Sequence, residues 1–149
     1  MKNLLLITTF ILFSISAYTQ KDGESIKKNA KGIIVEKGNF KNQKKDGVWQ
    51  YYYHDGLPSL EANYIKGVLN GESKRYDLTG NVIANLNYVD GEITGKQTYY
   101  YSNGKVLSTG EMINGREIGP WKYYTPNGEV AGYVKFENGV QLDEQSKKK

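Results

Sequence analysis

The chain has 149 residues, of which 24% are charged and 13% are aromatic, and a formal net charge of +4. It contains no cysteine and one histidine, which excludes disulfides and leaves too few soft or imidazole ligands for a dedicated zinc or copper site. The length predicts a single domain, and the small net charge gives no global basic field for nucleic acid.

Residues 1–19 are expected to be a cleaved export signal. Lys2 is followed by a short apolar run from Leu4 to Ile15, and Ala17 and Thr19 suit a cleavage site before Gln20. Cleavage after Ala17, or an uncleaved anchor, is the alternative. Because no cysteine is available for a lipid anchor, we expect a secreted or periplasmic protein.

The region 38–142 is predicted to be a repeat domain, preceded by a flank at 20–37 and followed by a lysine-rich tail at 143–149. Glycine recurs at the same three places in units 47–70, 71–94, 95–118 and 119–142, a signature of a quasi-linear array. Residues 38–47 align with the second strand and loop of such a unit but carry Gln43 where glycine is expected, so this unit is predicted to be a degenerate cap. The recurring glycines are Gly47, Gly56, Gly67, Gly71, Gly80, Gly91, Gly95, Gly104, Gly115, Gly119, Gly128 and Gly139.

Each unit is predicted to contain two strands and two turns, which makes the fold class all-β, an elongated antiparallel array of hairpins. The first turn contains Gly56 and its equivalents. Pro126 favours a three-residue turn, since proline fits the second place of a type I turn but would lose a ladder hydrogen bond in a two-residue hairpin. The second connection is expected to be a glycine-bounded loop, such as residues 67–71.

This turn length predicts which side chains are buried. If the sixth and tenth residues of each unit are paired, the repeated tyrosines Tyr52, Tyr76, Tyr100 and Tyr124 share the core face with Leu60, Ala62, Tyr64, Leu86, Tyr88, Val106, Met112, Val134 and Phe136. The opposite face is aromatic but irregular, which is what a binding surface would show. The candidate ligand-binding residues are therefore Trp49, Tyr51, Tyr53, Tyr99, Tyr101, Trp121 and Tyr123. The alternative is that these aromatic side chains only pack across strands.

The pattern resembles the MORN repeat, in the variant found in bacterial proteins, some of which are labelled antitoxins. The resemblance covers residues 47–142 and rests on G-V-W-Q-Y-Y at 47–52, G-P-W-K-Y-Y at 119–124 and the recurring Y-x-x-x-G spacing. It implies a row of hairpins used for contacts with proteins or lipids. Choline-binding cell-wall repeats, which also use tryptophan, tyrosine and glycine, are a weaker resemblance.

Enzymatic chemistry is not expected. His54 lies beside Asp55 at a predicted turn, no nucleophile set is evident, and the carboxylates are spread along the array. No cofactor, metal or nucleic-acid partner is predicted, and membrane contact would be peripheral at most. We expect a non-enzymatic protein that binds another protein through its aromatic face, with an antitoxin-like or immunity-like role. Glycan or cell-wall binding and a purely structural envelope role are the alternatives.

Overall fold

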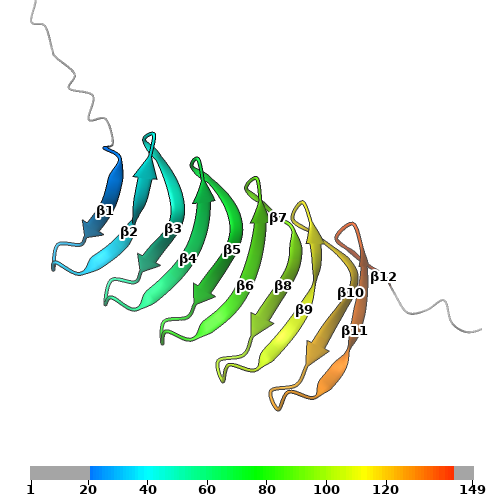
Figure 1. Ribbon diagram of the computed structural model, residues 1–149. Coiled ribbons are helices and arrows are strands. Elements are labelled where there is room, and N and C mark those ends of the chain that lie inside the picture. Colours follow the sequence, from blue (N-terminus) through cyan, green and yellow to red (C-terminus); the bar gives the residue numbers. More distant parts are fainter. Residues whose placement is uncertain (1–20, 143–149) are drawn as a thin grey trace, which may run out of the picture.

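The computed structural model describes residues 21–142, which form one antiparallel sheet of twelve strands (Figure 1). Neighbouring strands follow the chain order, except that β7 pairs with β6 beside β8. This confirms the predicted all-β hairpin array. The strands are β1 (Gly23–Lys28), β2 (Ile34–Lys41), β3 (Lys44–Tyr52), β4 (Pro58–Ile65), β5 (Val68–Tyr76), β6 (Val82–Val89), β7 (Glu92–Ile93), β8 (Gly95–Tyr100), β9 (Val106–Ile113), β10 (Arg116–Tyr124), β11 (Val130–Glu137) and β12 (Val140–Leu142).

Two kinds of turn alternate along the array. The first turn contains three residues, as predicted, but it joins the seventh and eleventh residues of a unit rather than the sixth and tenth. Around Pro126, the amide of Thr125 donates to the carbonyl of Glu129 and the amide of Gly128 donates back to the carbonyl of Thr125. The second connection is tighter than the predicted glycine-bounded loop. It consists of two residues with positive φ, as in Lys66-Gly67 between the paired Ile65 and Val68, which is the geometry of a type I′ hairpin turn.

The prediction of which tyrosines are buried is wrong, because every first hairpin contains a β-bulge. In β3 and β4, Tyr52 pairs with Pro58 while Tyr51 pairs with Leu60, so Ser59 is an extra residue without a partner. Because side chains alternate between the two faces of a strand, one extra residue moves every side chain beyond the bulge to the opposite face. Leu60 and Ala62 therefore share a face with Tyr51 and Trp49 rather than with Tyr52.

The same bulge recurs in the later repeats and defines two faces. One face of the sheet carries Trp49, Ala62, Leu86, Trp121 and Val134, together with the side chains that point to the same side of each strand. We call it the tryptophan face. The repeated tyrosines Tyr52, Tyr76, Tyr100 and Tyr124 lie on the other side, which we call the reverse face. The buried apolar side chains of the described residues all belong to the tryptophan face, so this face holds the core: Trp49, Ala62, Ala84, Leu86, Met112 and Trp121.

A second irregularity bends the strands. Where β10 pairs with β9, three residues from Gly119 to Trp121 lie opposite the single residue Gly110, and Gly119 has a φ of 64°. Glycine adopts positive φ without a steric penalty, so it can initiate this bend. Figure 1 shows the result, a row of hairpins each bent into an arc. The bend encloses the tryptophan side chains although the sheet has only one layer.

The sheet extends beyond the predicted repeats at its N-terminal end. Residues 20–37 are predicted to be a flank, but residues 23–41 form β1, β2 and the turn between them, a complete additional hairpin. Gln43 takes the glycine position of the following turn with a φ of 61°. The expected signal at 1–19 and tail at 143–149 lie outside the described residues. The described part of the chain contains no helix long and apolar enough to cross a membrane.

Candidate functional site

The two tryptophans predicted to bind a ligand are instead buried between repeats. Trp49 is 1% exposed and Trp121 is 4% exposed. Each indole lies flat against a glycine of the preceding hairpin, Gly38 or Gly110, where an added Cβ would approach three ring atoms within 3.0 Å. Each indole N–H donates to a backbone carbonyl, of Asn39 for Trp49 at 3.0 Å and of Glu111 for Trp121 at 3.2 Å. The tryptophans are therefore supports of the sheet.

The intervening repeats fill the same position with other side chains, matched in size to their neighbours. Ser73 pairs with Ala62 in one repeat, and in the next Gln97 lies in the row of Leu86. An indole occurs only over glycine in these four rows, because the bend leaves a fixed space between repeats.

Gln97 is fully buried and bonds to the bend itself. Its Oε1 accepts from the amide of Asn87 at 3.0 Å, and its Nε2 donates to the carbonyls of Gly95 at 2.9 Å and Thr94 at 3.3 Å. A buried amide must find partners to avoid a desolvation penalty. Here those partners are backbone groups of the bend. Gln97 therefore supports the bend from inside, as tryptophan does in the first and last repeats.

Tyr51 is held in a closed cluster around Lys45. The Lys45 ammonium lies 2.5 Å from a carboxylate oxygen of Glu36 and 2.7 Å from the Tyr51 hydroxyl, and 4.1 Å from the Trp49 ring centroid. The Tyr51 and Tyr64 hydroxyls are 3.1 Å apart. Burial, reinforced by the hydrogen bond with Tyr51, raises the pKa of Tyr64 to about 12. These groups satisfy each other and leave little for a ligand.

Tyr53 and Tyr101 connect successive repeats. The Tyr53 hydroxyl donates to the carbonyl of Tyr76, and the Tyr101 hydroxyl donates to the carbonyl of Tyr124, both at 2.7 Å. Each bond joins the turn of one hairpin to the end of the next. These two predicted site residues thus have a structural bond that a ligand would have to break.

Tyr99 and Tyr123 are the two predicted site residues that remain open. Tyr99 pairs with Ser108 and Ser108 pairs with Tyr123, so the three side chains form one row across β8, β9 and β10. We call Tyr99, Ser108 and Tyr123 the tyrosine row. Both tyrosines are half-buried, and no residue between 21 and 142 makes a hydrogen bond to either hydroxyl.

Charged groups surround this row. Burial, and to a smaller extent the negative charge of Glu117, raises the pKa of Tyr99, whereas the positive charge of Arg75 lowers it. The Tyr99 ring also supports Trp121, at 6.1 Å between ring centroids. The row therefore offers two phenol groups with charges of both signs nearby on a rigid sheet, a surface suited to recognition.

Nothing in the described part of the chain gathers three or more metal-ligating side chains. His54 lies in the three-residue turn between β3 and β4 and contributes its backbone carbonyl to a hydrogen bond from Asn29 at 3.1 Å.

The regular hairpin spacing allows comparison with known repeat families. Three segments of this chain match the MORN repeat variant. The matched residues are 69–90, 93–114 and 117–138, each covering one hairpin. MORN repeats commonly serve as interaction modules for proteins or lipids. The hairpin of β3 and β4 has the same pairing but lies outside the matched segments. No curated protein matches this chain.

Proposed function

We propose that this chain is a non-enzymatic repeat module that binds another protein through the tryptophan face, with the tyrosine row as the point of contact. The observation that carries the proposal is that Tyr99 and Tyr123 lie in one row of the tryptophan face and that no described residue bonds to either hydroxyl. Tyrosine is enriched among the residues that dominate interface energies, because it buries a large rigid ring and offers a polar end.

A protein partner is favoured over a glycan because of where the indoles lie. Sugar rings stack on flat, open aromatic surfaces, and the largest aromatic surfaces of this chain, those of Trp49 and Trp121, are covered. A mixed surface of tyrosine, Arg75 and Glu117 instead offers hydrogen bonds and charges of both signs, which suits a polypeptide.

The site of action in this proposal is outside the cytoplasm. This location rests on the export signal expected at residues 1–19. The role that we propose there is neutralisation of a toxin or a related immunity function in the envelope. Determining the N-terminal residue of the purified exported protein tests this part. A chain that begins at Met1 and is retained in the cytoplasm contradicts it.

Partner binding can be tested by immobilising the protein and capturing proteins from an envelope extract, with peptidoglycan and soluble glycans as separate arms. The informative variant is Tyr123→Ser, because no ring contact or side-chain hydrogen bond is lost with it among the described residues. Tyr76→Ser, the same change at a half-buried tyrosine of the reverse face far from β11, is the matched control. We expect Tyr123→Ser to reduce capture of a specific protein while the control retains it. Equal capture by both variants, or binding to glycan alone, refutes the proposal.

A further inference from the structure

The outer edge of β11 is uncovered over most of its length. β12 pairs only with residues 135–137, so no strand of the described chain pairs with residues 130–134 on that side. In earlier repeats the corresponding segment is paired, as Leu60–Ala62 is with Ser73–Arg75. Within residues 21–142, the backbone groups on this side of β11 have no strand partner, as at the edge of a sheet that can accept another strand.

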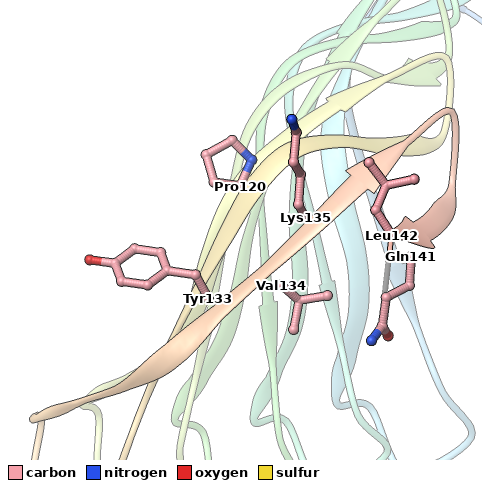
Figure 2. Close-up of a pocket in the computed structure, with 6 residues that line it drawn as sticks. All are labelled: Pro120, Tyr133, Val134, Lys135, Gln141 and Leu142. Atoms are coloured by element: carbon pink, nitrogen blue, oxygen red, sulfur yellow. The ribbon is translucent and has the colours of Figure 1, made fainter. Parts of the chain in front are cut away.

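The side chains at this edge lack the cover that their equivalents have. Val134 corresponds to Ala62 and Leu86, which are 0% and 2% exposed, whereas Val134 is only half-buried. Tyr133 is 61% exposed. Figure 2 shows a hollow at this edge, with Tyr133 and Val134 pointing to opposite sides of the strand. The hollow has a volume of about 200 Å³ and is completed by residues of β10 and β12.

The opposite end of the sheet differs in character. The outer strand β1 carries the charged side chains Glu24, Lys27 and Lys28, all exposed. Charged edge strands resist pairing with another chain. The exposed Ile26 of β1 is thus flanked by charged side chains, whereas residues 130–134 of β11 carry none.

The charge at the β11 edge is positive on the reverse face. Lys122 and Lys135 flank Tyr133, and the Lys122 ammonium is 5.8 Å from the Tyr133 ring centroid. The one ion pair of residues 21–142 joins Lys45 and Glu36, so neither of these two lysines has an ion-pair partner there. A carboxylate opposite Tyr133 would lie close to both ammonium groups.

We propose that residues 130–134 of β11 accept an extended segment of a partner protein as an additional antiparallel strand. The side chain opposite Val134 is of serine or glutamine size, because only glycine leaves room for an indole at this position. The next residue is acidic and lies opposite Tyr133. The one after is aromatic and lies opposite Gly132, where a Cβ would have no atom within 4 Å. This edge adjoins the tyrosine row but is a separate surface, so it adds to the proposed function.

The chain itself supplies a probe. A synthetic peptide with the sequence of residues 92–100 carries glutamine in the position that faces Val134, followed by Thr98 and Tyr99. Replacing Thr98 by glutamate in this peptide completes the proposed pattern. We expect the labelled Thr98→Glu peptide to bind the full-length protein and to slow hydrogen exchange of the amides of residues 130–134. A Thr98→Lys peptide should bind roughly tenfold more weakly or worse, as should a Gln97→Trp version of the Thr98→Glu peptide.

A charge exchange in the protein makes the test specific. Tyr133→Glu should reverse the preference, so that the Thr98→Lys peptide binds better than the Thr98→Glu peptide. Leu78→Glu is the matched control, since Leu78 is 72% exposed in a distant turn, and it should leave the preference unchanged.

Four results would overturn the proposal. The first two are equal binding of all three peptides and binding without protection of residues 130–134. The third is binding only after removal of residues 143–149, which would make that segment the occupant. The fourth is self-association that Tyr133→Glu abolishes, which would make a second copy the occupant.

Discussion

Gly110→Ala tests the packing of a tryptophan on the preceding repeat. The new methyl group would lie within 3.0 Å of three atoms of the Trp121 indole, which is itself fixed by Phe136 and by a hydrogen bond to Glu111. Forcing a methyl group into a filled space costs about 1–3 kcal/mol. We therefore expect the free energy of unfolding, measured by urea denaturation, to fall by about that amount.

A double-mutant cycle separates this contact from general effects. Trp121→Ser alone should cost about 3–5 kcal/mol, as for other buried tryptophans truncated to small residues. Adding Gly110→Ala to it recreates the combination of Ala62 and Ser73, so the methyl group should cause no further loss. The coupling energy should then be about 1–3 kcal/mol. Gly132→Ala is the control, and it should be neutral or stabilising because its Cβ has no neighbour within 4 Å. Additive effects, or an unchanged stability of Gly110→Ala, would refute the reasoning.

Three further changes test other parts of the sheet. Gln97→Met removes the side-chain bonds to the bend, and it should lower the free energy of unfolding by about 1–3 kcal/mol because buried backbone groups lose their partners; an unchanged urea midpoint would contradict this. Tyr101→Phe loses the bond to the next repeat and should cost about 0.5–1.5 kcal/mol, with Tyr53→Phe giving a similar loss by the same assay; a loss in only one of them would show that the repeats differ. Because the folded state raises the pKa of Tyr64 to about 12, its stabilising effect should be complete below pH 10 and lost as the pH rises toward 12. In an absorbance titration that follows phenolate formation, the wild-type protein should show a late step near pH 12 that Tyr64→Phe lacks. If the two curves instead differ by a tyrosine that titrates in the ordinary range, the prediction is wrong.

Much of the architecture could be predicted from glycine and proline. The recurring glycines predict repeats and turns because they mark positions of positive φ, and Pro126 predicts the three-residue turn because its φ is fixed. These residues act locally, so their effect is visible in the sequence alone.

The facing of the aromatic side chains could not be predicted in the same way. It depends on the bulge residues Ser59, Ile83, Leu107 and Ala131, which share no chemical property. A β-bulge of this kind requires no special residue, so the sequence contains no direct mark of it. Without the bulge, the predicted register places Trp49 and Trp121 on the face opposite the core.

One signal in the sequence would have found the buried tryptophans. Gly38 precedes Trp49 by the same interval as Gly110 precedes Trp121, and the other two repeats combine Ala62 with Ser73 and Leu86 with Gln97. Each tryptophan thus lies opposite a glycine, the relation expected of side chains that share one space. In contrast, the open hydroxyls of Tyr99 and Tyr123 depend on which neighbours happen to reach them, and only the structure gives that.

The burial of the two tryptophans can be measured directly. Trp49 and Trp121 are the only two tryptophans of the chain, so acrylamide quenching of the protein's indole fluorescence reports on them alone. We predict quenching several-fold weaker than that of free tryptophan, rising to the free value on unfolding in urea. Efficient quenching in the native protein would place the indoles at the surface and contradict the assignment of the tryptophan face as the core.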